Sequence, residues 1–269
     1  MRNAIIEQEL GRTKPRIFIL AMFVLCLVEM DSPAQNFLPI FPPGHSTTDG
    51  NSFSTIPFSG GASTVRFQQI YDASGFVAQG GTIPYLIRSI NFRVDAGRPG
   101  FGSQFPDFQI NLSTTSRSID GLSSLFTDNV GADDTAIVAR GSFSFAVNSV
   151  GDFNSIFLTT PFYYDPSRGN LLLDIRNFGG GNTIWGIPPF TGPAYVDASN
   201  VTGDRVSRVF ANDVDALSGT ADSLGLVTQF WITPVPEPPA LALLAVGLGV
   251  LALGWKRMKK GKEAQDAAH

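Results

Sequence analysis

Residues 89–94 read Ser89-Ile90-Asn91-Phe92-Arg93-Val94, a strict alternation of polar and apolar side chains. A period of two is typical of a β-strand that has one buried and one wetter face. The segments 108–113 and 142–147 show the same period, with Ala146 in a polar position, and in 171–176 Leu171, Leu173 and Ile175 alternate with Leu172, Asp174 and Arg176. Shorter runs of strand-forming residues occupy 64–71, 136–140, 156–160, 182–187, 205–211 and 225–233. We therefore predict roughly ten short strands.

Turn-forming residues separate these segments, at 95–100, 120–121, 165–169 and 179–182. Glycine there supplies positive φ, proline presets φ, and Asp or Asn bonds back to the local backbone. Many short strands without helical crossovers favour an all-β fold. We expect an antiparallel β-sandwich, jelly-roll-like, over residues 64–233. Residues 35–63 are rich in Pro, Gly, Ser and Thr, and we expect them to form a loop-rich lead-in.

The composition of the central region narrows the class of protein further. Between Gln35 and Thr233 the chain has ten arginines and 16 aspartates but no lysine and no glutamate, a formal charge of −6. Because Lys and Glu are good helix formers and Asp and Gly are poor ones, a helical bundle is excluded. A net-negative region without a basic stripe also argues against nucleic acid as a partner.

The N-terminus has the pattern of a secretory signal peptide. A basic leader precedes the 12 apolar residues 17–28, which span about 18 Å as a helix, too short for a bilayer core of about 30 Å. Ser32-Pro33-Ala34 supplies small residues for signal peptidase, so we predict a signal helix within residues 1–34 and cleavage after Ala34. An uncleaved anchor remains the alternative. Cleavage after Ala34 would remove Cys26, the one cysteine of the chain. The mature protein could then form no thiolate metal site.

The C-terminus has three parts. Residues 234–239 are rich in proline, and proline enforces an extended backbone that joins neither strand nor helix. Residues 240–255 follow as a predicted single transmembrane helix, whose 15 residues from Ala240 to Gly254 carry no charge. Its length of about 22 Å is short for a bilayer and suits a temporary tether. A basic tail at 256–269 should stay cytoplasmic and leave the central domain outside. The residues expected to stop the helix in the membrane are Trp255, Lys256, Arg257, Lys259 and Lys260.

This ending resembles the PEP-CTERM sorting signal of exported proteins from Gram-negative bacteria that make extracellular polysaccharide. The matching residues are Val235, Pro236, Glu237 and Pro238, followed by the apolar helix and the basic cluster. The resemblance covers about 26 residues and implies that a membrane-embedded exosortase cuts near the Pro-Glu-Pro and passes the protein outward. The protein would then be anchored transiently in the inner membrane before it reaches the cell surface or the medium. A plain single-span anchor is the alternative.

The central region offers little for catalysis. The chain has two histidines, His45 in the lead-in and His269 at the end, and no G-x-S-x-G elbow. We therefore predict no catalytic residue, no cofactor and no metal ligand. Paired carboxylates at Asp133-Asp134 and at Asp213 and Asp215 could serve glycoside hydrolysis or bind Ca²⁺, although turn capping is the simpler role for them.

Exposed aromatic side chains are the remaining candidates for binding, because sugar rings stack on them. Trp185 lies beside a glycine run, and Tyr163 and Tyr164 precede a Pro-Gly turn. We expect these three to be the most exposable aromatics of the domain, and phenylalanines at alternating positions to form its core. Three functions follow in order of preference. The first is an exported, non-catalytic surface or matrix protein, the second a glycan-binding module associated with exopolysaccharide, and the third a secreted hydrolase that uses Asp pairs.

Overall fold

The structure is a computed structural model that describes residues 36–58, 64–96, 98, 101–147, 151–179, 182–185, 194–235 and 247–255. Residues Gln35–Val235 form one compact unit, and Met1–Ala34 group with Pro236–His269 in a second. The first unit begins directly after the predicted signal cleavage site and ends inside the predicted sorting motif. The signal helix and the cleavage site at Ala34 lie outside the described residues, so both stay predictions.

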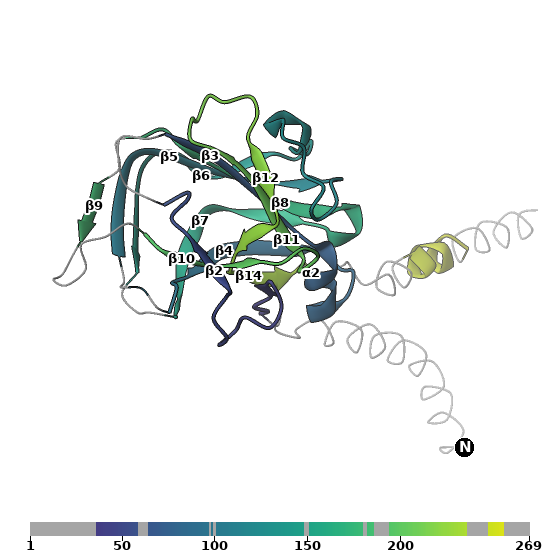
Figure 1. Ribbon diagram of the computed structural model, residues 1–269. Coiled ribbons are helices and arrows are strands. Elements are labelled where there is room, and N and C mark those ends of the chain that lie inside the picture. The colour runs from purple at the N-terminus through teal and green to yellow at the C-terminus, as the bar shows by residue number, and fades with distance from the viewer. Residues whose placement is uncertain are drawn as a thin grey trace, which may run out of the picture. The chain divides into compact units, whose positions relative to one another are not determined.

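The compact unit is built from three antiparallel sheets (Figure 1). A four-stranded sheet has the order β1 (Ile40–Phe41), β14 (Thr228–Pro234), β4 (Tyr85–Arg93), β7 (Phe153–Tyr164). A seven-stranded sheet has the order β12 (Thr220–Asp222), β11 (Val206–Ala211), β3 (Val65–Tyr71), β8 (Asn170–Asn177), β5 (Phe101–Thr115), β6 (Thr135–Val147), and β9 (Asn182–Trp185) also pairs with β5. A small sheet joins β13 (Leu224–Leu226), β10 (Val196–Asn200) and β2 (Ser52–Ser54). The short helices are α2 (Ala73–Gly80), η1 (Phe126–Asp128) and η2 (Pro166–Arg168).

The two larger sheets pack face to face over an aromatic core. The ring of Tyr71 on β3 lies 4.8 Å from that of Phe230 on β14, at a right angle. Phe58 packs edge-on against Phe92 of β4 at 5.0 Å and stacks with Phe108 of β5 at 6.1 Å. All five side chains are at most 1% exposed. The prediction of an antiparallel β-sandwich is therefore confirmed.

The seven-stranded sheet is covered on its other face as well. Residues 116–134, which include η1, cross that face and bury a second cluster of Ile70, Leu122, Phe126, Leu172 and Val209. For this reason β8 is apolar at consecutive positions, with Leu171, Leu172 and Leu173 all fully buried. Such double burial is typical of a strand that lies inside its sheet.

The segment predicted as a loop-rich lead-in, residues 35–63, also contributes to the core of the sandwich. This segment contributes β1 and β2, and it places Phe41 and Phe58 in the centre of the core with no exposed surface. Its proline-rich composition indicates turns, and the structure has turns there. Phe41 and Phe58 lie between the turns and nevertheless reach the core. No periodic strand pattern surrounds them, so the sequence does not predict their burial.

Helix α2 was also not predicted. It begins after Asp72, whose carboxylate accepts a hydrogen bond from the Ser74 N–H at 2.8 Å, a normal N-cap. The helix packs on Phe41, because a Cβ at Gly75 would lie 2.3 Å from that ring. Eight residues with a glycine in the third position give too weak a helical signal to be read from sequence.

Several strand boundaries differ from expectation. Residues 136–140 and 142–147 belong to one long strand, β6, and the run 225–233 is divided at Val227 between β13 and β14. The strands β1, β2, β10 and β12 are two to five residues long, which is too short for periodicity to mark.

Of the predicted transmembrane helix at 240–255, the structure describes Gly247 to Trp255, and these nine residues are helical. Most of their apolar side chains are exposed, from 57% at Leu248 to 76% at Trp255. In the described part of the chain, no helix has both the length and the apolar character needed to cross a membrane. Residues 240–246 lie outside the described residues, so the membrane-spanning helix stays a prediction.

Candidate functional site

The sorting segment starts where the sandwich ends. Strand β14 pairs with β4 as far as Pro234, opposite Tyr85, and the Val235 N–H then donates to the Pro84 carbonyl at 2.9 Å. Of the predicted motif, Val235 is described and half-buried; Pro236, Glu237 and Pro238 lie outside the described residues. The predicted stop residues Lys256, Arg257, Lys259 and Lys260 also lie outside them. A peptidase that acts after Val235 would therefore not need to unfold a strand.

The structure corrects one of the predicted glycan contacts. Tyr164 is fully buried, and its hydroxyl donates to the Gly169 carbonyl at 2.8 Å, so the prediction is wrong for this residue. Tyr163, one position earlier on β7, points the other way and is 48% exposed. Burial raises the pKa of the Tyr164 hydroxyl far above its usual range. The backbone of Trp185 ends β9, opposite Gly102 on β5, and its side chain lies outside what the structure describes.

Two aromatic residues that the sequence analysis did not single out, the exposed Phe157 and the half-buried Trp231, lie on the same sheet as Tyr163. Phe157 on β7 is 66% exposed, and its ring lies 6.4 Å from that of Trp231 on β14. The available signal was the period of two, because Phe157 follows the buried Ile156 and Trp231 lies between the buried Phe230 and Ile232. The expectation that phenylalanines form the core therefore fails at Phe157.

The predicted carboxylate pairs hold loops in place. Asp133 accepts hydrogen bonds from the N–H and the Oγ1 hydroxyl of Thr114, and Asp134 accepts two from the Asn111 amide at 3.0 Å each. Asp213 accepts the N–H of Asp215 at 3.0 Å, a local turn bond. The carboxylates of Asp133, Asp134 and Asp213 are thus engaged with loop or strand atoms.

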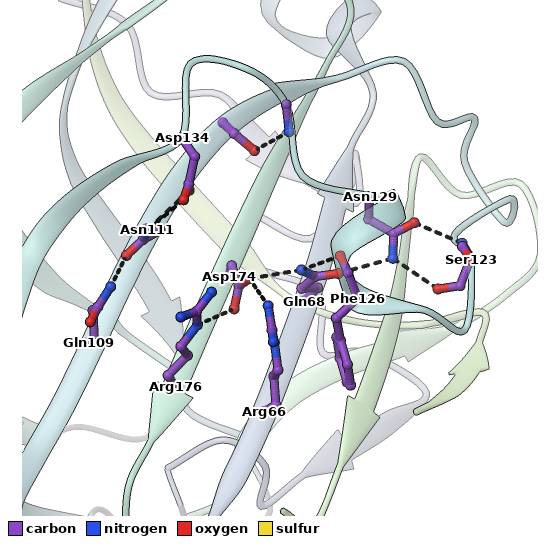
Figure 2. Close-up of polar contacts among 12 residues, drawn as sticks. Arg66, Gln68, Gln109, Asn111, Ser123, Phe126, Asn129, Asp134, Asp174 and Arg176 are labelled. Atoms are coloured by element: carbon purple, nitrogen blue, oxygen red, sulfur yellow. Dashed lines mark hydrogen bonds and ion pairs between the residues drawn. The ribbon is translucent and has the colours of Figure 1, made fainter. Parts of the chain in front are cut away.

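A buried polar network lies beneath residues 116–134 (Figure 2). The Gln68 amide donates to Asp174 at 2.8 Å and to the Phe126 carbonyl at 3.1 Å, and the Asn129 amide donates to Gln68 at 3.0 Å. Asp174 also pairs with Arg66 at 3.0 Å. The side chains of Gln68, Asn129 and Asp174 are at most 4% exposed. The network fixes the covering segment to the sheet.

A second buried charge cluster surrounds Arg93, which is 3% exposed. Its Nη1 donates to the carbonyls of His45 at 2.8 Å and Thr48 at 2.6 Å, and its Nε lies 3.5 Å from Asp197 Oδ2. In the described part of the chain, the carboxylate oxygens of Asp49, Asp95 and Asp197 approach within 4.8 Å of one another, a spacing that would suit a metal ion.

The guanidinium of Arg93 already supplies a cation to that cluster. It forms ion pairs with Asp197 and, at 3.8 Å, with Asp49. The His45 carbonyl is occupied by Arg93, and the His45 ring lies at the Thr48 carbonyl, 3.2 Å away. The arrangement ties the loop at residues 42–50 to β4 and β10.

The charge cluster predicts a pH dependence of stability. Burial raises the pKa of Asp197 from 3.8 to about 6, opposed by the hydrogen bond that its carboxylate accepts from the Gly50 N–H. A carboxyl whose pKa is raised on folding destabilises the fold once it is ionised, so its contribution falls as pH rises through the window from about 4 to 6. We expect the Asp197 contribution to the unfolding free energy to be about 1 kcal/mol lower at pH 7 than at pH 5.

Urea unfolding at both pH values measures this difference, and Asp197→Asn provides the comparison. The asparagine variant has no carboxyl to ionise at this position and should therefore lack the pH 5 to 7 decrement. Equal decrements in the variant and the native protein would contradict the assignment to Asp197. Asp152→Asn, an exposed change in a turn, is the matched control.

A small pocket lies at the edge of the seven-stranded sheet. It has a volume of about 190 Å³ and is lined by Asp120, Leu122, Ser207, Arg208, Ala221, Asp222 and Ser223. Its arginine is committed to a two-bond pair with Asp222 at 2.9 and 3.0 Å and to the Ser54 hydroxyl at 3.1 Å. Pockets for small molecules usually enclose about 300–1,000 Å³, so this one is too small to be a strong candidate.

Comparison with known proteins identifies the C-terminal segment. Residues 234–259 match the PEP-CTERM protein-sorting motif. No curated protein matches the chain. The matched segment starts at the last residue of β14 and includes all four predicted motif residues, from Val235 to Pro238. It also includes four of the five predicted stop residues, Trp255, Lys256, Arg257 and Lys259, and Lys260 follows directly. The predicted resemblance is therefore confirmed: the chain ends in a PEP-CTERM sorting motif, which marks an exported protein for an exosortase.

Proposed function

We propose that this protein is a non-catalytic component of the cell surface or extracellular matrix, released by an exosortase at its C-terminal motif. The observation that carries the proposal is the PEP-CTERM match at residues 234–259. It implies export and transient anchoring in the membrane before the chain moves to the cell surface. The sandwich of residues Gln35–Val235 would be the product that remains.

The chemistry of the two ends supports this route. Signal peptidase would remove residues 1–34, and the apolar segment 240–255 would hold the chain in the inner membrane with the basic tail inside. Its short length favours transfer to the peptidase over permanent insertion. The extended Pro236-Glu237-Pro238 would present the backbone to the exosortase, since proline excludes both strand and helix there.

The non-catalytic part of the proposal is supported by the bonding of the candidate groups. His45 bonds to the Thr48 carbonyl, Asp133 accepts the Thr114 N–H, and Asp134 accepts the Asn111 amide, so each is engaged in a contact within the fold. The hydrolase hypothesis has no specific observation in its favour. Glycan binding has one, the exposed aromatic side chains on the four-stranded sheet, and it is kept as the second candidate function.

We also infer that the sandwich is a jelly roll. Strands β1, β3, β4, β5, β6, β7, β8 and β14, lettered B to I in chain order, lie in the orders B-I-D-G and C-H-E-F in the two large sheets. The chain therefore crosses between the sheets at most connections, as in two nested Greek keys. Lectin domains are among the proteins with this architecture, but a likeness of fold leaves function to be argued from a site.

Mass spectrometry of the product from the native host tests the main proposal. The mature protein should begin at Gln35 and end between Val235 and Pro239, and deletion of the exosortase should leave the C-terminus intact. A mature chain that still ends at His269 in the presence of the exosortase would overturn the proposal and favour a plain anchor.

A further inference from the structure

The outer face of the four-stranded sheet places aromatic side chains in one row. Ser89 on β4 pairs with Trp231 on β14 and with Phe157 on β7, so these three residues lie side by side across three strands. The Trp231 and Phe157 rings meet above Ser89 at 6.4 Å and 81°. Tyr163 lies further along β7, opposite Leu86.

These side chains are turned away from the core. Phe157 is 66% and Tyr163 48% exposed, whereas the neighbours Ile156, Phe162 and Tyr164 are at most 4% exposed. Large aromatic groups that stay accessible on a sheet face are unusual in a monomeric protein and mark a contact surface. The row forms a rigid platform, because its residues belong to paired strands.

Polar side chains adjoin the platform. The half-buried Gln229 accepts a hydrogen bond from the Asn91 amide at 3.0 Å, and Asn91, itself 4% exposed, accepts one from the buried Ser89 hydroxyl at 3.0 Å. On the other side, Arg88 donates to the Thr233 hydroxyl at 3.2 Å. Amides and hydroxyls can both donate and accept hydrogen bonds, which matches a hydroxyl-rich ligand better than an apolar one.

The charged residues of this sheet indicate the class of ligand. The central region has 16 aspartates, yet the strands β1, β14, β4 and β7 contain none. Their two charged residues are Arg88, which is half-buried on the outer face, and the buried Arg93. An acid-free face with one arginine, in a domain of net charge −6, favours an anionic ligand at this place over the rest of the surface.

We propose that this face, defined by Trp231, Phe157, Tyr163, Gln229 and Arg88, binds an extended polysaccharide that contains acidic sugars. The C–H faces of the pyranose rings would stack on Trp231 and Phe157, the hydroxyls would bond to the Gln229 amide, which Asn91 holds in place, and Arg88 would meet a carboxylate. The inference develops the second candidate function and does not depend on how the C-terminus is processed.

Binding of the full chain, purified in detergent, to immobilised polyuronate tests the proposal, with dextran as the neutral polymer. We expect retention on polyuronate and about tenfold weaker binding for Phe157→Ala and for Trp231→Ala, because each removes one stacking surface. Trp231→Tyr should retain most of the binding. Arg88→Gln should weaken binding to polyuronate and reduce its dependence on salt.

Phe53→Ala is the matched control, since Phe53 is 41% exposed but lies on β2, outside this face. Phe157→Ala should leave the thermal midpoint unchanged because its side chain is largely exposed, which separates lost binding from lost folding. No retention of the native chain on polyuronate, equal retention on dextran, or an unchanged affinity of Phe157→Ala and Trp231→Ala would each overturn the proposal. None of these outcomes bears on cleavage at the sorting motif, which is measured by mass spectrometry.

Discussion

Replacing Glu237 by Gln in the native host is expected to reduce the released protein by about tenfold or more, leaving a membrane-bound form with its C-terminal tail. The substitution keeps the size of the side chain and removes its negative charge. In a segment that proline holds extended, this charge is the one ionic feature available for recognition, and a lost charge-assisted contact typically changes binding by at least that factor. Immunoblots of membrane and medium, with mass spectrometry of the C-terminus, measure the effect.

Glu263→Gln is the matched control, because it removes the same charge in the tail outside the matched residues 234–259. It should be processed as the native chain is. Pro236→Ala should accumulate the same membrane form as Glu237→Gln, since alanine lets the backbone leave the extended conformation. Unaltered processing of both motif variants would show that the release does not depend on the motif. The sandwich ends at Val235, so its unfolding midpoint should not change in any of the three.

Sequence periodicity located the centre of the sandwich well. Ile90 and Phe92, and likewise Phe108, Ile110 and Leu112, were predicted as the buried side of their strands, and all are at most 1% exposed. Period two succeeds for these residues because each strand has one face on the core and one outside. Where both faces of a strand are buried, as at Leu172, polar residues no longer alternate with apolar ones. The sequence then does not indicate which segment covers the second face.

A period of two also predicts which of two adjacent aromatic residues on a strand can bind a ligand, because only one of them faces outward. Tyr163 and Tyr164 are adjacent and therefore cannot both be exposed on one strand; the structure buries Tyr164. The expectation that phenylalanines form the core fails at Phe157, because its neighbour Ile156 faces the core and Phe157 therefore faces outward. The Arg93 cluster could not have been predicted, because it joins residues 49, 95 and 197, which only the tertiary fold brings together.

Truncation of Phe41 to alanine is expected to give the largest loss of stability among single changes in the lead-in, about 3–5 kcal/mol. The side chain is fully buried, and its ring lies 5.5 Å from that of Tyr71, 4.9 Å from that of Phe76 and 6.0 Å from that of Phe230. These partners belong to β3, α2 and β14, so the substitution leaves a cavity where both sheets and the helix meet. For a domain of this size the melting temperature should fall by roughly 10 °C.

Leu38→Ala separates this effect from a general sensitivity of the segment. Leu38 precedes Phe41 by three residues and is 53% exposed, so its truncation should change the unfolding free energy by about 0.5 kcal/mol or less. Chemical unfolding of the two variants, followed by tryptophan fluorescence, compares them directly. If residues 36–58 were a loop laid over a complete sandwich, the two losses would be similar and small. A large loss for Phe41 alone means that the sandwich is completed by a segment whose composition indicates only turns, because one buried aromatic contact outweighs the local preference of the prolines around it.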